Sequence, residues 1–154
     1  MKPVAPPSVS VASESAWSAD TDQGEAADPA PRALYQRLKL IAGLLKDAGP
    51  LSKPGRYLLW RGEDGQVQHR LIDRDLVIGR ASDCDIVLDD PRISRRHALI
   101  RHHSEADILV DLDSANGTVI NGLGHTSPCI LCDGNVIAAG GTALLHHDRR
   151  EIEP

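Results

Sequence analysis

Three short clusters of polar residues and glycine lie close together in the sequence, each after an apolar run typical of a strand. The planar guanidinium of arginine can bind two phosphate oxygens at once, and a serine hydroxyl can donate to a third oxygen. Asparagine offers a donor and an acceptor, which suits it to hold the main chain of an extended peptide. An anion site flanked by side-chain amides is therefore predicted from Gly79-Arg80, Ser94-Arg95-Arg96-His97 and Asn116-Gly117-Thr118, with Asn121-Gly122 just behind.

Nothing in these clusters predicts a reaction centre, a metal site or a cofactor. Ser94 and His97 are the one serine–histidine pair in a suggestive order, but neither a nucleophile elbow nor an orienting acid accompanies them. Cys129 and Cys132 lack a second cysteine pair to complete a zinc site, and a turn rather than a helix follows them. We therefore expect a binding protein and not an enzyme.

The charge distribution points to a small anionic partner. Residues 1–31 carry one lysine and five acidic residues, so they account for −4 of the formal net charge of −5. Residues 91–103 carry four arginines, three histidines and no acid, which is too small a patch to predict duplex nucleic acid as the target. No apolar run is long enough to cross a membrane and no secretory signal is visible, so a cytoplasmic location is expected.

A tail and a helix are predicted ahead of the strand-rich region. Residues 1–31 are rich in Pro, Ser, Ala and acids, which predicts a disordered segment, and residues 149–154 are expected to be disordered as well. Residues 32–49 predict an amphipathic helix and a linker. The helix at 32–47 carries an apolar stripe, which leaves docking on its own domain and self-association as open alternatives; the stripe is Leu34, Leu38, Ile41 and Leu45.

Beyond residue 55 the sequence reads as many short strands separated by turns. This pattern of short strands and turns, without intervening helices, predicts an all-β sandwich whose end loops carry the three clusters. The adjacent histidines at 102–103 and 146–147 are expected to be exposed at loops or strand ends. The expected strands cover 56–60, 66–72, 76–78, 85–88, 98–101, 108–112, 118–120, 129–131, 136–137 and 142–145.

The ordered set of clusters resembles a forkhead-associated (FHA) domain. The residues that carry the resemblance are Gly79-Arg80, Ser94-x-x-His97 and Asn116-Gly117, and the flanks at 85–88, 111–118 and 131–137 agree with it. Several spaced motifs in the right order make the match specific. The resemblance implies an FHA-type sandwich of about eleven short strands over residues 55–148, with apical loops that bind phosphothreonine peptides.

The resemblance also implies roles for individual residues. By position, Arg80 and Ser94 contact the phosphate and Arg95 supports them. Asn116 holds the peptide main chain just after the phosphothreonine, and Asn121 assists it.

Other positions are architectural or set specificity. Gly79, His97 and Gly117 are expected to be architectural, with His97 bracing the loop that presents Ser94. Arg92 matches a position that reads the third residue after the phosphothreonine, which would favour an acid there. Ala115 stands where many members have a threonine or serine, so a hydroxyl contact is missing and affinity or phosphothreonine selectivity is expected to be lower.

These features predict a non-catalytic adaptor that binds a Thr-phosphorylated protein and so reads the output of a Ser/Thr kinase. No nucleic acid, membrane, metal or cofactor is expected as a partner. The alternative is a phosphate-independent assembly scaffold that uses the FHA surface and the helix at 32–47. Thr21, the one threonine of the tail, is a candidate regulatory phosphosite that folds back onto Arg80 and Ser94.

Overall fold

The structure is a computed structural model that describes residues 30–125 and 128–150. The segments 1–29 and 151–154, and Thr21 with them, lie outside the described residues, so what the sequence predicts for them stays a prediction. The chain divides into two units, Met1–Gln36 and Arg37–Pro154, and all strands belong to the second. Within the described ranges, no helix is long and apolar enough to span a bilayer.

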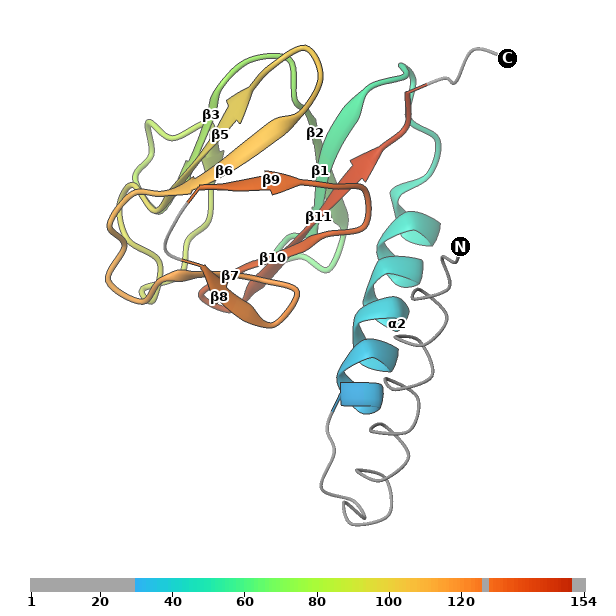
Figure 1. Cartoon of the computed structure of the whole chain (residues 1–154), viewed down its shortest axis with the longest axis horizontal. Helices are drawn as coiled ribbons and strands as arrows, with labels where there is room; N and C mark the ends of the chain where they lie inside the picture. Colours follow the sequence, from blue (N-terminus) through green and yellow to red (C-terminus); the bar gives the residue numbers. More distant parts are fainter. Residues whose placement is uncertain (1–29, 126–127, 151–154) are drawn as a thin grey trace, which may run out of the picture. The chain divides into compact units, whose positions relative to one another are not determined.

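The described residues form eleven strands in two packed sheets, which confirms the all-β sandwich expected from the sequence (Figure 1). One sheet has the order β2-β1-β11-β10-β7-β8 and the other β4-β3-β5-β6-β9, with only β3 and β4 parallel. The bounds are β1 Arg56–Arg61, β2 Val67–Leu71, β3 Leu76–Gly79, β4 Ile86–Val87, β5 Ala98–His102, β6 Asp107–Asp111, β7 Thr118–Ile120, β8 Leu123–His125, β9 Cys129–Leu131, β10 Val136–Ala139 and β11 Thr142–Asp148.

The core between the sheets is aliphatic, since the chain contains no phenylalanine. Leu76 and Ile78 of β3 are buried opposite Ile100 and Ala98 of β5, whereas the residues between them are half-buried. This period of two is that of a strand with one face on the core. The other sheet supplies the fully buried side chains of Leu58, Ile137 and Leu144.

The strand β8 was not expected from the residues. Only three residues long, it follows β7 through a two-residue loop in which Asn121 has φ 53° and Gly122 has φ 84°. Positive φ at both positions matches the type I′ turn that suits the twist of a hairpin. The Asn-Gly pair was a visible hairpin signal, but too few apolar residues follow it to predict a strand.

The helix α2, Ala30–Ala48, is present as expected, but its buried face is not the predicted stripe. Leu44 is 1% exposed and packs with Leu40 and Ile41 against residues of β1, β10 and β11, while Leu45 is 38% and Leu38 54% exposed. From Arg37 onward the helix therefore docks on the outer face of the six-stranded sheet, along β1 and β11 (Figure 1). The stripe was misplaced because apolar residues cover more than one face of this helix, and periodicity cannot choose between them.

A buried polar cluster joins the two sheets at the end opposite the β4–β5 and β6–β7 loops. Asp107 of β6 is fully buried, with Arg56 Nε of β1 and His146 Nε2 of β11 each 2.9 Å from its Oδ2. His102 of β5 approaches Oδ1 at 3.3 Å. The expectation that His146 is exposed is wrong, because its side chain is drawn inward by the only buried carboxylate of the described residues, and His102 is half-buried.

Candidate functional site

The three clusters meet at one end of the sandwich through direct hydrogen bonds. Arg80 follows β3, Ser94 lies in the β4–β5 loop and Asn116 lies in the β6–β7 loop. Arg80 N donates to Ser94 O at 3.1 Å, and Ala115 N donates to Ser94 Oγ at 2.9 Å. Asn116 Nδ2 donates to Arg92 O at 2.7 Å. The β4–β5 loop therefore stands in the middle and is bonded to both neighbours.

The Arg80 side chain is exposed and anchored at one atom. Its Nε donates to Ile93 O at 3.0 Å, which holds the guanidinium in place and leaves its two terminal nitrogens for a ligand. Among the ion pairs of the described residues, none includes Arg80 or the exposed Arg95. Uncompensated arginine charge on a rigid strand end is an arrangement that favours a phosphate dianion.

His97 links the loop of Ser94 to the loop of Asn116. Its fully buried ring accepts from Ser94 N through Nδ1 at 3.0 Å and lies 2.9 Å from Gly117 O through Nε2. The carbonyl can only accept, so the proton sits on Nε2. Both nitrogens are occupied by main chain, and His97 therefore cannot act as a base on the Ser94 hydroxyl. These contacts connect the two loops, and the bracing role that the resemblance implies for His97 stays a prediction.

The Ser94 hydroxyl is oriented by the main chain of the facing loop. Because its oxygen accepts from Ala115 N, the hydroxyl proton points elsewhere and remains free to donate. A serine so placed offers one donor to an anion held by Arg80. The side chain at position 115 takes no part in this bond, so alanine there leaves the Ser94 geometry intact.

Gly79 is required by close packing beneath the site. A Cβ at this position would collide with Arg95 O and come within 2.9 Å of Cys84 Sγ. The same carbonyl accepts from Ala81 N at 3.0 Å, so the end of β3 lies directly against the loop that carries Arg95. A side chain at position 79 would push the end of β3 away from the β4–β5 loop.

The two asparagines differ in what they contact. Asn116 is exposed and uses Nδ2 on Arg92 O, which leaves Oδ1 to accept from a peptide N–H. Asn121 uses Oδ1 to accept from Val136 N at 2.8 Å and holds the turn between β7 and β8. This bond gives Asn121 a structural task, and its part in peptide binding stays a prediction.

Two carboxylates that organise these loops were missed by sequence reasoning. Asp111 accepts from Ser114 N at 3.0 Å, Ser114 Oγ at 2.6 Å and Thr118 Oγ1 at 2.7 Å, which fixes the β6–β7 loop. Burial opposes ionisation of Asp111, but the hydrogen bonds from the Ser114 and Thr118 hydroxyls and from Ser114 N together outweigh it, and the pKa of Asp111 is lowered. The Asp-x-x-Ser spacing was the available signal, because aspartate commonly bonds the main chain a few residues on. The second carboxylate, Asp90, binds Arg92.

Arg92 does not present a free charge. Its Nε and Nη2 donate to Asp90 at 3.0 and 2.9 Å, and these bonds lower the pKa of Asp90 and raise that of Arg92. Within residues 30–125 and 128–150, no group of three or more His, Cys, Asp or Glu side chains is placed to hold a metal ion. The clusters thus bring together arginine side chains, a serine hydroxyl and a side-chain amide.

Comparison with known proteins agrees with this geometry. A sequence profile of the FHA domain matches residues 76–140. The oxoglutarate dehydrogenase inhibitor of Corynebacterium jeikeium is 31% identical over 113 residues, which cover 70% of this chain and 78% of that protein. The glycogen accumulation regulator GarA of Mycobacterium tuberculosis is 40% identical over 94 residues, which cover 60% of this chain and 57% of that protein. FhaA of the same organism is 35% identical over 77 residues, 50% of this chain but 14% of FhaA.

Solved structures give the same result. A structure from a study of phosphothreonine-dependent FHA domain interactions aligns with a TM-score of 0.54 at 30% identity, covering 64% of this chain and 97% of that one. The FHA domain of FhaA, solved in complex with the intracellular domain of Rv3910, aligns with a TM-score of 0.54 at 31% identity, covering 60% and 100%. With its sandwich, its loop clusters and these relatives in agreement, the chain belongs to the forkhead-associated (FHA) domain family.

Proposed function

We propose that this chain is a phosphothreonine-peptide-binding adaptor that reads the output of a Ser/Thr kinase and carries out no catalysis. The observation that carries the proposal is the convergence of Arg80 and Ser94. The Arg80 guanidinium is anchored through Nε to Ile93 O, the neighbour of Ser94, and the Ser94 hydroxyl is oriented by Ala115 N, which supports a shared anion. Asn116 lies one loop away with its Oδ1 open to a peptide main chain.

The expected affinity follows from the number of donors. Two or three charge-assisted hydrogen bonds of about 1.5–3 kcal/mol each give roughly 4–8 kcal/mol, which corresponds to millimolar to micromolar binding. Arg95, exposed beside Ser94, adds positive charge to the same surface. Such reversible binding suits a signalling adaptor.

The named functions of the relatives support the proposal of an adaptor, but only part of what those proteins do can be proposed for this chain. They are named as an inhibitor and a regulator, and one FHA structure comes from a study of phosphothreonine-dependent interactions. The chain spans most of the inhibitor but 14% of FhaA, so the partners of those whole proteins are not assigned to it. The kinase, the cytoplasmic location and the regulatory role of Thr21 remain predictions.

The test is a phosphothreonine peptide library, followed by titration of the best sequence in phosphothreonine, phosphoserine and unmodified forms. We expect binding that requires the phosphate. Arg80→Lys should weaken it at least about tenfold, because lysine cannot form the two-nitrogen contact with phosphate oxygens. Arg101→Lys on β5, an exposed arginine outside the site, is the matched control and should bind normally. Equal affinity for all three peptide forms would rule the proposal out.

Self-association through α2 is a second candidate function. The observation that favours it is the exposure of Leu38 and Leu45, which the docked face of the helix leaves uncovered. Sedimentation of the full chain should then show a dimer that Leu38→Glu abolishes. A monomer for both proteins would exclude this use of the helix.

A further inference from the structure

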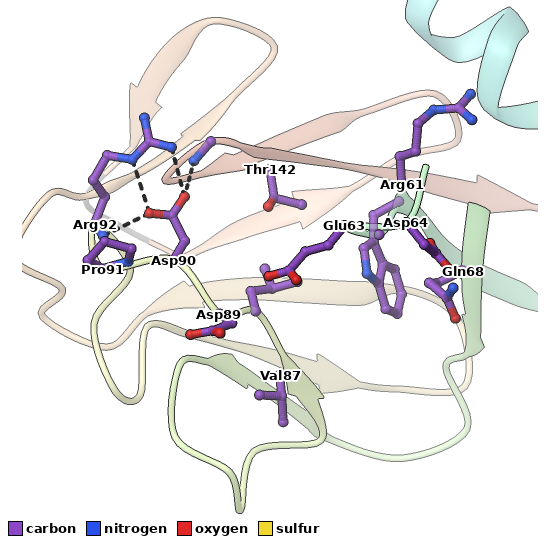
Figure 2. A pocket seen from close by; sticks show the side chains of 14 residues that line it. Arg61, Glu63, Asp64, Gln68, Val87, Asp89, Asp90, Pro91, Arg92 and Thr142 are labelled. Atoms are coloured by element: carbon purple, nitrogen blue, oxygen red, sulfur yellow. Dashed lines mark hydrogen bonds and ion pairs between the residues drawn. The ribbon is translucent and has the colours of Figure 1, made fainter. Parts of the chain in front are cut away.

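One carboxylate makes four hydrogen bonds beside the peptide-binding loops. Asp90 Oδ1 accepts from Arg92 N at 2.9 Å and Arg92 Nε at 3.0 Å, while Oδ2 accepts from Arg92 Nη2 at 2.9 Å and Gly141 N at 2.8 Å. Figure 2 shows the Asp90 carboxylate facing the Arg92 guanidinium, with dashed lines for these bonds. Nε and Nη2 form an edge of the guanidinium that can bind a carboxylate with two parallel bonds. Asp90 therefore occupies the position that an acidic ligand residue would take on this edge.

The pair is built into the fold rather than loosely placed on the surface. Gly140 and Gly141 form the turn between β10 and β11, and side chains there would collide with the pair: a Cβ at 140 would lie 2.8 Å from Asp90 Oδ2, and one at 141 would meet Arg92 Nη2. Asp90 is well covered, with 14% of its side chain exposed, whereas 66% of Arg92 is exposed. The turn thus holds the acid while the arginine remains within reach of a ligand.

The pair is also one bond from the peptide-binding amide. The main-chain carbonyl of Arg92 accepts from Asn116 Nδ2, so a peptide held by Asn116 passes next to the Asp90–Arg92 pair. A cleft of about 900 Å³ borders the pair and is lined by Glu63, Asp64 and Asp89 (Figure 2). Its remaining arginine, Arg61, pairs with Asp47 at 2.8 Å.

These contacts set the charge that a ligand meets. An isolated Arg92 would attract acidic residues of the peptide, but the Asp90–Arg92 pair has no net charge and the cleft beside it is negative. Repulsion by the acidic residues of the cleft and occupation of the guanidinium edge by Asp90 both disfavour acidic residues of the peptide. On the basis of the proposed function, we infer that Asp90 is a specificity-determining residue: it neutralises Arg92 so that the site takes phosphothreonine segments with neutral or basic flanks and gains nothing from acidic ones.

The test compares phosphothreonine peptides that carry a single Glu or a single Ala at each flanking position in turn. The measured quantity is the ratio of Kd values, Ala peptide to Glu peptide, within each protein. Because each protein is its own reference, a general loss of affinity or stability cancels. The proteins are the full-length wild type, Asp90→Asn, Arg92→Gln and the double variant Asp90→Asn/Arg92→Gln.

In the wild type, Arg92 should give Glu no advantage, so the ratio at each position should be the same in the wild type and in Arg92→Gln. Asp90→Asn frees the guanidinium edge, so Glu should be favoured about two- to fivefold at one position, a gain typical of an exposed ion pair. The double variant should return to the wild-type ratio, which shows that the gain acts through Arg92. A merely structural role for Asp90 would lower the affinity for both peptides and leave the ratio unchanged.

Three outcomes would overturn the inference. In the first, the wild type binds Glu peptides more tightly than Ala peptides and Arg92→Gln loses this preference. In the second, Asp90→Asn has the same Kd ratio as the wild type. In the third, the double variant keeps the raised Kd ratio of Asp90→Asn. If Asp90→Asn does not fold, comparing the Kd ratios of the wild type and Arg92→Gln still tests the inference through the first outcome. The absence of phosphate-dependent binding in every protein would instead defeat the proposed function and the inference with it.

Discussion

At the scale of single residues, the orientation of the Ser94 hydroxyl does not depend on a side-chain hydroxyl at position 115, where this chain has alanine. Ala115 contributes through its main chain, because its N–H donates to Ser94 Oγ at 2.9 Å. The orientation of Ser94 therefore survives the missing side chain. What is missing is one additional donor at the exposed rim of the site, where Ala115 itself lies.

Ala115→Ser should restore that donor. We expect a gain in phosphopeptide affinity of about two- to tenfold, as one net hydrogen bond contributes about 0.5–1.5 kcal/mol. Titration with the same phosphopeptide measures it, and Ala106→Ser, between β5 and β6 at the other end of the sheet, is the control. No gain, with the fold intact, would show that the ligand passes out of reach of position 115.

At the scale of elements, α2 acts as part of the folded domain. From Arg37 onward it covers the outer face of the six-stranded sheet, where Leu44 lies against Leu59 and Leu145 with almost no exposure. The structure therefore has a second apolar layer besides the core between the sheets. Removing residues 1–49 would expose this outer face of the six-stranded sheet to water.

Two adjacent leucines test the docking directly. Leu44→Ala should lower the free energy of unfolding by about 2–5 kcal/mol, because it opens a cavity under the helix. Leu45→Ala, at a side chain 38% exposed, should cost less than about 1 kcal/mol. Urea unfolding followed by circular dichroism measures both values. Similar costs for the two variants would mean that the helix is not docked by this face.

At the scale of the whole molecule, the Arg56–Asp107–His146 cluster ties the two sheets together at the end opposite the β4–β5 and β6–β7 loops. Burial opposes ionisation of Asp107, but the hydrogen bonds from His146 and His102 and the charge of Arg56 outweigh it, so its pKa is lowered from the ordinary 3.8. A carboxyl with a lowered folded-state pKa stabilises the fold fully above its unfolded-state value. That stability is lost as the pH falls through the folded-state value.

Asp107→Asn should therefore cost about 3–5 kcal/mol at neutral pH, because it leaves Arg56 buried without a counter-charge. The difference from the wild type should shrink as the pH falls below about 4, where Asp107 of the unfolded wild-type chain takes up a proton, and should vanish once the folded carboxyl is protonated at still lower pH. Urea unfolding over a pH series measures the difference, with the exposed Asp113→Asn as control. A difference that stays constant down to the acid limit would contradict the assignment of the pH effect to Asp107.

The sequence by itself determined the sandwich, the positions of most strands along the chain and the loops that carry the three clusters. It could do so because alternating apolar residues specify a strand with one buried face, and because Gly79, Asn116-Gly117 and Asn121-Gly122 are local turn and packing signals. Arg80 directly follows β3, Ser94 lies four residues before β5, and Asn116 lies five residues after β6. Their meeting at one end then follows from the antiparallel order of those strands.

Only the tertiary structure decided which of these groups have partners. His146 is buried where it contacts Asp107, which is 39 positions away in the sequence. Leu44 rather than Leu45 is buried because the six-stranded sheet packs against that face of α2. Arg92 has its acid two residues away, but Gly141, 51 positions from Asp90, is what holds that acid in place. Residue type and spacing describe what a side chain can bind, whereas burial and pairing depend on neighbours that folding brings from distant parts of the chain.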